Sequence, residues 1–415
     1  MIKPIAVALI LTLACTAITL MTIGEVPVSI FLLVSVPALT LAAIYFFIWR
    51  GRVKLFGVWV IAAYICLSSL INLHDAKLTS VIYSGIFLLT FLVLMNCRRY
   101  LPVETFSRTL RAVIILYFAN VVISQVLVMT GAADDVLGNI FHRLYDERIG
   151  VVRYYGFSSE PSYAAFVVLV SFLGWYSLPG AASRRQLLLY SALVLYQVVA
   201  FSSIYGYLLA VAVAGVIAYR ELPRRIFYLL PATLLLVAVM ADFQTVVDSG
   251  SRVVRIAQAL VSGQILSALD LNDIDSSLFL RIAPFTEYFN SLNPADYHCY
   301  LGHGAMASTS FMTDTFLSHV HPDGDTVRTG FIPAFLYDYG LIGASLVIVL
   351  LLRLISGRKF SLAVVIFLAM LFNANFNTQL FWYIVIVFAL VGLYQPPPIE
   401  INTAHGRLQP EEAGA

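Results

Sequence analysis

The stretch LLLYSALVLYQVVAFSSIYGYLLAVAVAGVIAY, residues 187–219, decides how this chain is organised. It carries no charged residue, and it is too long for one membrane-spanning helix, which needs about 20 residues. It is barely long enough for two. The segment 201–206, FSSIYG, has the small and polar residues of a tight turn in its middle. Whether the stretch is one span or two fixes the side of the membrane on which every later segment lies.

The composition is that of a polytopic membrane protein. Hydrophobic residues make up 60% of the chain and charged residues only 12%, whereas soluble domains carry about 25% charged residues. The net charge of +2 says little by itself, because the distribution of the charges along the chain matters more than their sum. The sequence contains no basic soluble domain that would bind nucleic acid. The four cysteines lie far apart, without the spacing of a disulfide framework or a metal site.

Further apolar runs of spanning length recur along the chain. We predict spans at residues 4–23, 28–48, 55–73, 78–96, 112–131, 161–179, 187–202, 205–219, 226–241, 331–352, 360–377 and 379–394. The first run follows Lys3 and is long enough to cross a bilayer, so we expect an uncleaved helix rather than a signal peptide.

The basic residues favour two spans within 187–219. Lysine and arginine collect in short cytoplasmic loops. The clusters are Arg50/Arg52/Lys54, Arg98/Arg99/Arg108/Arg111, Arg184/Arg185, Arg220/Arg224/Arg225 and Arg353/Arg358/Lys359. With twelve spans every cluster falls on one side together with both termini, whereas with eleven the later clusters change sides. We therefore expect about 12 transmembrane helices, with the termini in the cytoplasm.

This topology leaves two long loops on the outer face, at residues 132–160 and 242–333. The sequence thus predicts an all-α polytopic membrane protein with a single transmembrane domain over residues 1–394. The proline-led polar tail, residues 395–415, is expected to be a disordered cytoplasmic segment.

The first outer loop ends in RYYGFSSEPS, residues 153–162. Pro161 suits the first position of a helix, with Glu160 or Ser159 as its cap. Glu160 then has two interpretations: a capping carboxylate favoured by the helix dipole, or a base at the mouth of a membrane cavity.

The second outer loop holds an isolated arginine and a histidine-rich end. Residues 251–269 have the apolar spacing of a helix lying on the outer surface. Arg281 stands in an apolar run, so it needs either a carboxylate such as Glu287 or an anionic ligand. The segment 319–328 contains His321 and Arg328 just before the tenth span. Its His-Val-His spacing lacks any established metal-binding pattern, and we expect neither a metal nor a cofactor.

Arginines beside aromatic residues suit a lipid-linked sugar phosphate at the outer leaflet. A guanidinium group matches phosphate oxygens two at a time and keeps its charge. Aromatic rings offer an apolar face to a sugar and a polar edge to its hydroxyls. Fixed arginines can neutralise a pyrophosphate leaving group without a metal.

Three segments resemble the O-antigen polymerase (Wzy-type) family and its relatives, the exopolysaccharide polymerases and O-antigen ligases. They are Arg153-x-x-Gly-Phe-x-x-Glu160-Pro161, Ser276-Ser-x-x-x-Arg281 followed by Gly302-x-Gly304, and Phe335-Leu-Tyr-Asp-Tyr-Gly340-Leu-Ile-Gly343. The ligases carry a His-Asn pair about eleven residues before the last glycine motif, where this chain has Thr329-Gly330. The resemblance therefore favours a polymerase.

The resemblance implies a glycosyltransferase-C-like fold and a metal-independent glycosyltransferase. Its reaction would join undecaprenyl-pyrophosphate-linked oligosaccharide repeats into O-antigen or exopolysaccharide at the outer face of a bacterial inner membrane. The expected pyrophosphate-binding residues are Arg153 and Arg281, with Arg148 and Arg328 as weaker candidates. The expected base is Glu160 or His321, and the expected sugar contacts are Tyr154 and Tyr155.

The expected partners are the lipid-linked donor and acceptor, membrane lipid and a chain-length regulator protein, and no nucleic acid. Two alternatives stay open. One is a ligase that transfers finished polymer to a lipid A core. The other is a flippase or transporter of lipid-linked oligosaccharide, although such proteins usually place ionisable residues at mid-membrane on broken helices. Asp338 is the only charged residue inside the predicted spans.

Overall fold

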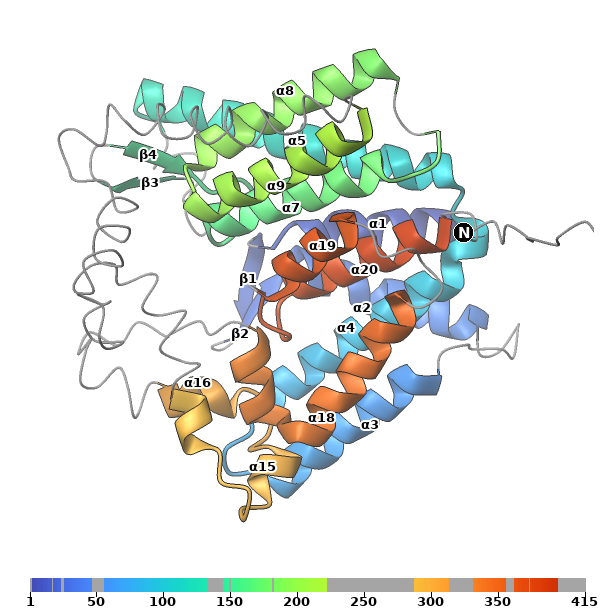
Figure 1. The fold of residues 1–415 in the computed structure, drawn as a ribbon, viewed down its shortest axis with the longest axis vertical. Helices are drawn as coiled ribbons and strands as arrows, with labels where there is room; N and C mark the ends of the chain where they lie inside the picture. The colour runs from blue at the N-terminus through green and yellow to red at the C-terminus, as the bar shows by residue number, and fades with distance from the viewer. Residues whose placement is uncertain are drawn as a thin grey trace, which may run out of the picture.

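The computed structural model describes most of the helical part of the chain (Figure 1). The described residues are 2–16, 18–23, 26–46, 56–132, 145–148, 151–180, 183–221, 287–312, 331–355, 362–372 and 374–394. The predicted span 226–241, the predicted surface helix 251–269 and the tail 395–415 lie outside these residues.

Helices dominate the described chain, and the strands are short. The helices are α1 (Ile2–Ala14), α2 (Ile30–Ala43), α3 (Phe56–Ile71), α4 (Leu78–Cys97), α5 (Val103–Thr130), α7 (Pro161–Tyr176), α8 (Arg184–Phe201), α9 (Ile204–Glu221), α15 (His298–Leu301), α16 (Ala307–Met312), α18 (Phe331–Ile355), α19 (Leu362–Phe372) and α20 (Gln379–Tyr394). The strands β1 (Thr19–Ile23) and β2 (Val26–Ser29) form one antiparallel pair, and β3 (Tyr145–Arg148) and β4 (Val151–Tyr154) form another.

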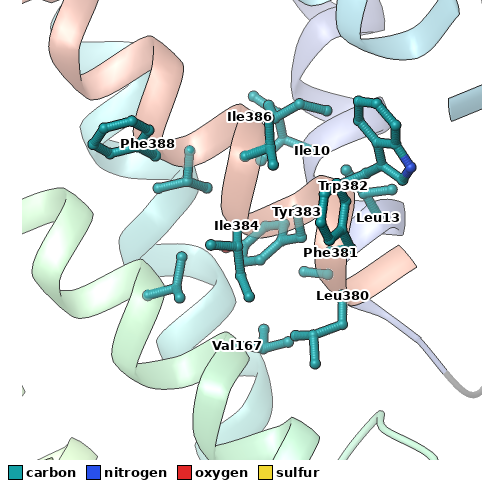
Figure 2. Packing of buried hydrophobic residues seen from close by; sticks show 14 of the residues in the cluster. Ile10, Leu13, Val167, Leu380, Phe381, Trp382, Tyr383, Ile384, Ile386 and Phe388 are labelled. Carbon is teal, nitrogen blue, oxygen red and sulfur yellow. The ribbon is translucent and has the colours of Figure 1, made fainter. Parts of the chain in front are cut away.

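Helices α7 and α20 form the centre of the bundle. Nearly every side chain of both helices is buried, which is typical of helices that are apolar all round and enclosed by others. Figure 2 shows Val167 of α7 close to Leu380 of α20, with Ile10 and Leu13 of α1 packed on the same cluster. Helices α5, α8 and α9 lie on the α7 side, and α2, α4, α3 and α18 lie on the other (Figure 1).

The outer helices turn apolar side chains away from the bundle. Leu195 of α8, Leu208 of α9 and Leu352 of α18 are each more than half exposed. Within the described chain, Leu78–Tyr100, Val103–Thr130 and Phe331–Ile355 are long and apolar enough to cross a membrane, and several apolar helices are shorter. An apolar exterior of this kind needs lipid around it, so the chain is a helical membrane protein. The prediction of 12 spans and of a glycosyltransferase-C-like fold stays a prediction.

The two chain ends described lie at the same end of the bundle. Helix α1 begins and α20 ends there, whereas β3, β4, α15 and α16 lie at the opposite end (Figure 1). Arg98 donates a hydrogen bond to the carbonyl of Leu393, and its guanidinium carbon lies 5.7 Å from the centre of the Tyr394 ring. A basic residue therefore lies beside the end of α20, and the predicted cytoplasmic location of the termini stays a prediction.

The predicted turn that divides residues 187–219 is confirmed. Helix α8 ends at Phe201, Ser202 takes a left-handed conformation with φ 45°, and α9 begins at Ile204. The amide of Ser202 donates to the carbonyls of Val198 and Val199, which closes the last turn of α8.

The predicted first span, residues 4–23, is wrong as a single helix. Helix α1 stops at Ala14, and a hairpin of β1 and β2 follows before α2 begins. The segment 16–28 is rich in Thr, Ile and Val and contains Pro27, a composition that favours strands over helix. An unbroken apolar run does not by itself separate these two structures. At the fifth span the helix is longer than predicted, so Arg108 and Arg111 lie within α5 rather than in a loop.

Candidate functional site

Arg153 and Arg148, predicted for the first outer loop, lie on a β-hairpin at the end of the bundle opposite the start of α1 (Figure 1). Arg153 and Tyr154 belong to β4, and Arg148 belongs to β3. The backbone register pairs Arg153 with Asp146 across the two strands. Figure 1 shows the hairpin beside the ends of α5 and α8.

Tyr154 and Tyr155 are buried, with exposed fractions of 9% and 6%. Tyr154 belongs to the same hydrophobic cluster as the central helices. Burial raises the pKa of the Tyr154 phenol, and the nearby Tyr196 raises it further, so the hydroxyl stays neutral. Both tyrosines anchor β4 to the bundle, and their predicted contact with a sugar stays a prediction.

The segment between β4 and α7 is held on the ring of Tyr117 in α5. Phe157 packs edge-on against this ring, with the ring centroids 5.4 Å apart. A β-carbon on Gly156, whose φ is +60°, would lie 2.9 Å from Tyr117 Cδ1, so only glycine fits. The hydroxyl of Tyr117 donates to the carbonyl of Ala14 at 2.7 Å and is 2.9 Å from Ser158 Oγ. One buried tyrosine thus joins the end of α1 to the segment that carries Glu160.

Removing the Tyr117 hydroxyl should loosen this junction. In Tyr117→Phe the Ala14 carbonyl and Ser158 lose their partner, and a buried polar group left unpaired costs about 1–3 kcal/mol. We expect the thermal midpoint in detergent to fall by several degrees, measured by intrinsic fluorescence. Tyr300→Phe, which alters an exposed tyrosine, is the control and should leave the midpoint unchanged. Equal midpoints for both variants would contradict this role of Tyr117.

Glu160 lies at the start of α7, as the sequence predicts. Pro161 occupies the first turn, and Glu160 is the cap residue with an extended backbone, φ −144°. Its side chain makes no capping hydrogen bond to the helix; instead, Ser162 Oγ donates to Glu160 Oε2 at 3.2 Å. The carboxylate is therefore close to the positive end of the helix dipole but is not committed to the helix amides.

A second polar cluster lies where the described part of the second outer loop meets α18. Helix α18 breaks at Gly340, whose φ and ψ are 62° and −173°. The break removes helix partners from the preceding carbonyls. The amide of His303 donates to the carbonyl of Tyr337 at 3.0 Å, and the amide of Gly304 donates to that of Asp338 at 2.8 Å. The Tyr64 hydroxyl donates to the carbonyl of Tyr339 at 2.8 Å.

The segment 296–305, which contains His303 and Gly304, is also held by α3. Polar side chains at and just beyond the end of α3 bind the carbonyls of this segment. Ser68 Oγ donates to the carbonyl of Leu301 at 2.7 Å, and Asn72 Nδ2 donates to that of Gly302 at 3.0 Å. Both side chains are buried, and they lie four residues apart, on one face of a helix. We call residues 296–305 the outer turn. It is fixed to α3 and α18 by hydrogen bonds that leave it little freedom to move.

Asp338 completes the attachment from within α18. Its carboxylate accepts hydrogen bonds from the amides of Ser308 at 2.7 Å and Met306 at 3.1 Å, at the start of α16. The side chain is only 2% exposed. The one carboxylate that the sequence places inside a predicted span therefore caps a short helix of the outer loop.

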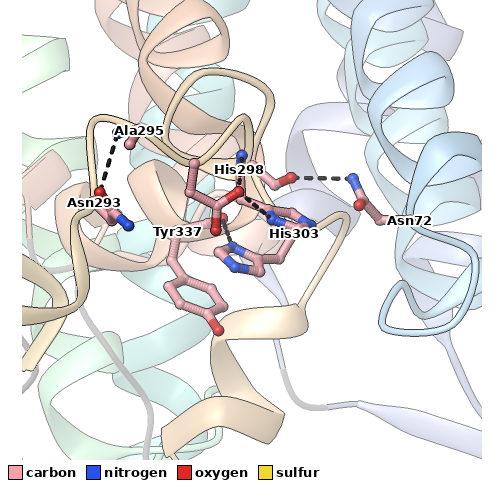
Figure 3. A network of polar contacts seen from close by, with 8 residues as sticks. Asn72, Asn293, Ala295, His298, His303 and Tyr337 are labelled. Carbon is pink, nitrogen blue, oxygen red and sulfur yellow. Dashed lines mark hydrogen bonds and ion pairs between the residues drawn. The ribbon is translucent and has the colours of Figure 1, made fainter.

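A stack of rings runs across the outer turn (Figure 3). His303 lies 4.4 Å from His298 and 4.0 Å from Tyr337 between ring centroids, with nearly parallel planes. Tyr297 covers the other face of His298 at 3.9 Å. Asp296 Oδ1 is 2.8 Å from His298 Nδ1.

His303 is a titratable residue of the outer turn that contacts α18. Burial, the largest cause, lowers the pKa of His303, and His298 lowers it further; the Tyr337 carbonyl, Asp296 and Asp75 oppose the shift. Because the folded pKa lies below the ordinary value, the unfolded turn binds a proton first as the pH falls. Stability is therefore complete above the ordinary value and is lost as the pH falls through it toward the folded pKa.

We expect the outer turn to open more readily at about pH 5 than at about pH 7.5, on either side of the ordinary histidine pKa of about 6.5. Hydrogen–deuterium exchange of residues 298–308, corrected for the intrinsic effect of pH, measures this opening. In His303→Gln, which cannot titrate, the difference in protection between the two pH values should shrink. The same difference in both proteins would contradict the role of His303.

The remaining predicted site residues lie outside the described part of the chain. These are Arg281, His321 and Arg328. Arg153, Tyr154, Tyr155 and Glu160 are described and lie within one short segment of the chain, residues 153–160. Among the described residues no three His, Cys, Asp or Glu side chains gather as metal ligands.

Sequence reasoning missed the outer turn and its support. Tyr64, Ser68 and Asn72 recur every four residues within an apolar helix, and this polar stripe was a readable signal. The pairing of Asp296 with His298 was visible as Asp-Tyr-His, but sequence does not show which way such side chains turn.

Comparison with known proteins assigns no family: no protein-family model matches the chain, and no curated protein matches it. What the chain does must be inferred from its own residues and their geometry.

Proposed function

We propose that this protein is a polysaccharide polymerase that joins undecaprenyl-pyrophosphate-linked oligosaccharide repeats at the outer face of a bacterial inner membrane. The observation that carries the proposal is the segment from Arg153 to Pro161. It is held on Tyr117 at the outer end of the central helix α7, with an arginine at its start and a carboxylate at its end. A guanidinium for a diphosphate and a carboxylate for a hydroxyl are what such a transfer needs.

The proposed reaction moves a growing glycan from its carrier to a second lipid-linked repeat. The acceptor hydroxyl oxygen forms a bond to the anomeric carbon of the donor, and the bond from that carbon to the pyrophosphate oxygen breaks. The electron pair leaves with the pyrophosphate, whose developing charge Arg153 neutralises. Glu160, or His321 of the second loop, receives the proton of the hydroxyl. Arg281, with Arg148 and Arg328, supplies further positive charge for the diphosphate.

The arrangement of the second outer loop supports the same proposal. Two segments that resemble the polymerase family, 302–304 and 335–343, pack directly against each other: a β-carbon on Gly340 would lie 2.6 Å from the amide nitrogen of Gly302. The two segments are separated by about thirty residues in the sequence, but they are in contact in the structure. This packing ties residues 302–304 of the second loop to helix α18.

A transporter is the second candidate, because α18 is broken and carries a buried carboxylate. In transporters the freed carbonyls and carboxylate of such a helix bind the substrate or ion. Here the outer turn and α3 already supply partners for the carbonyls of Tyr337, Asp338 and Tyr339. The amides of Met306 and Ser308, at the start of α16, bind the Asp338 carboxylate. The break in α18 therefore serves to attach the second loop, and its freed groups are not available to bind a transported substrate. This favours the polymerase over the transporter.

Reconstitution tests the proposal. The purified protein is placed in liposomes with radiolabelled lipid-linked repeats, and the products are separated by length. A ladder of longer glycans is the expected result. Movement of the label across the bilayer without new linkages would instead identify a transporter. Deletion of the gene separates polymerase from ligase: loss of a polymerase leaves single repeats on the lipid A core, whereas loss of a ligase leaves the core bare.

A further inference from the structure

Arg111 is a charged side chain whose buried nitrogen finds no hydrogen-bond acceptor in the described chain. It lies in α5, toward the end of the bundle where α1 begins and α20 ends (Figure 1). The buried nitrogen is Nε, and the guanidinium carbon lies 6.0 Å from the centre of the Tyr190 ring in α8. A ring attracts the positive charge but offers the N–H groups only a weak acceptor. The guanidinium group therefore still needs a partner.

The wall behind Arg111 is rigid, and its outer side is open. Tyr190 is buried and packs on the fully buried Trp175 of α7, with the ring centroids 4.9 Å apart. Arg111 itself is only partly buried, so a molecule outside the bundle can reach it. Arginine keeps its charge at any physiological pH, and burying an unpaired charge is unfavourable. An anion that approaches from outside the bundle is the partner that fits.

Three further arginines lie at the same end of the bundle. Arg108 lies one turn before Arg111 on α5, and Arg184 and Arg185 form the first turn of α8. All three are exposed, and the two helices pack against each other. Glu104 is the only carboxylate in α5 and α8, and it forms no ion pair with a described residue. The starts of these two helices therefore carry positive charge that the described chain does not balance.

The helix dipoles increase this positive charge. Helices α5 and α8 both begin at this end, and the start of a helix carries a partial positive charge that disfavours basic side chains. Ser183 and Gln186 form a capping box that satisfies amides at the start of α8. The unbalanced charge thus comes from the arginines and the dipoles rather than from free amides. A negative group beside the two helix starts would offset both sources.

Exposed apolar side chains lie directly beside the arginines. Ile115 and Leu116 follow Arg111 by about one turn on α5, and Leu188 and Leu189 follow the first turn of α8; all four are exposed. In a membrane protein such side chains face acyl chains, and an arginine next to them reaches the headgroup layer. Arg111 therefore lies where hydrocarbon meets headgroups. A soluble anion would contact only the arginines, whereas a phospholipid would contact both surfaces.

We propose that Arg111 and the arginines at the starts of α5 and α8 bind the phosphate group of an anionic phospholipid, whose acyl chains lie along the exposed apolar side chains of these helices. Phosphate oxygens are the acceptors that Arg111 lacks, and a guanidinium group binds two of them at once. A negatively charged headgroup is preferred to a zwitterionic one, because basic pockets between membrane helices recognise net negative charge. The inference does not depend on the proposed polymerase function.

The test measures lipid binding to the purified full-length protein in detergent by native mass spectrometry, with thermal unfolding as a second readout. Dioleoylphosphatidylglycerol is the anionic probe and dioleoylphosphatidylcholine the zwitterionic one. We expect phosphatidylglycerol to bind and to raise the thermal midpoint, and phosphatidylcholine to do neither. In Arg111→Gln the apparent Kd for phosphatidylglycerol should rise by about 10-fold or more, because a charge-assisted contact to phosphate is lost. Arg111→Lys keeps the charge without the planar fork and should be intermediate.

Two further variants make the result specific. Arg353→Gln removes an exposed arginine from the last turn of α18, at the same end of the bundle, and should bind phosphatidylglycerol like the wild type. The double variant Arg184→Gln/Arg185→Gln changes only exposed side chains, so its folding is not at risk. We expect its Kd to rise by about 5-fold or more.

Equal affinity of the wild type and Arg111→Gln for phosphatidylglycerol would overturn the inference. Should Arg111→Gln fail to fold, as judged by gel filtration, the double variant decides: an unchanged Kd overturns the inference, and a raised Kd supports it. Inorganic phosphate added with phosphatidylcholine separates a lipid from a soluble anion. The full rise in thermal midpoint with phosphate alone would overturn the assignment to a lipid, whereas a rise only with phosphatidylglycerol supports it.

Discussion

Replacing Arg153 by alanine should lower polymer formation by about 100-fold or more, while the protein still reaches the membrane. A fixed positive group aimed at a leaving diphosphate contributes on this scale, because it acts where charge develops in the transition state. Arg153 lies on β4, five residues before Ser158, whose side chain the Tyr117 hydroxyl contacts. Polymer length and amount in cells, and chain extension in liposomes, both report the loss.

Two further variants show whether the guanidinium group itself matters. Arg153→Lys keeps the charge but loses the planar fork that binds two phosphate oxygens, so an intermediate rate is expected. Arg99→Ala removes an exposed arginine at the other end of the bundle and should have no effect. The diphosphate mechanism would be contradicted if Arg153→Ala and Arg281→Ala each left polymer length and amount unchanged at normal protein levels.

Replacing Gly340 by alanine should detach the outer turn and prevent correct folding. With φ at 62° and ψ at −173°, this residue has a backbone conformation that is essentially restricted to glycine. An added β-carbon would also lie 2.6 Å from the amide nitrogen of Gly302, where the two backbones cross. Neither backbone can yield without breaking the hydrogen bonds of His303 and Gly304 to α18. We expect a loss of about 3 kcal/mol or more.

Gly85 provides a matched control, because it lies within α4 and an added β-carbon there meets nothing within 4 Å. Alanine at this position should be neutral or stabilising by up to about 1 kcal/mol. Thermal unfolding followed by size-exclusion chromatography measures both variants, and protease sensitivity of residues 296–305 reports detachment of the outer turn. A Gly340→Ala protein that unfolds at the wild-type temperature would show that the crossing of the two backbones is not needed.

The sequence alone predicted most of the helices, because in a membrane protein hydrophobic length is itself a structural requirement. The predicted spans 78–96 and 379–394 correspond to α4 and α20, and Pro161 begins α7 as expected. The turn at 201–206 was predicted from its residues and supported by the positions of basic clusters far away in the chain. These features follow from local composition and from the unfavourable transfer of charge across a bilayer.

The sequence could not show where tertiary contacts end or interrupt a helix. The hydrophobicity of the run 4–23 did not show that α1 stops at Ala14, whose buried carbonyl accepts a hydrogen bond from the Tyr117 hydroxyl. In the same way the apolar sequence around Gly340 did not show that α18 breaks there. Gly340 interrupts the helix and permits a close approach of the outer turn.

The candidate site was also predicted only in part from the sequence. Residue chemistry was enough to single out Arg153 and Glu160 and to predict a carboxylate at the start of α7. It also suggested Tyr154 and Tyr155 as sugar contacts, but only the structure showed that their rings are buried, while those of Tyr297 and Tyr300 are exposed.

What the sequence by itself determined is the class of protein, the position of most helices and the residues that carry charge on the outer loops. Those depend on hydrophobicity, charge and turn chemistry, which act over a few residues at a time. Only the tertiary structure decided that α3 and a broken α18 hold the outer turn, and that Asp296 aims His298. Such arrangements depend on groups more than two hundred residues apart, for example the Ser68 hydroxyl and the Leu301 carbonyl. Hydrogen-bond partners are set by proximity in space rather than by spacing along the chain.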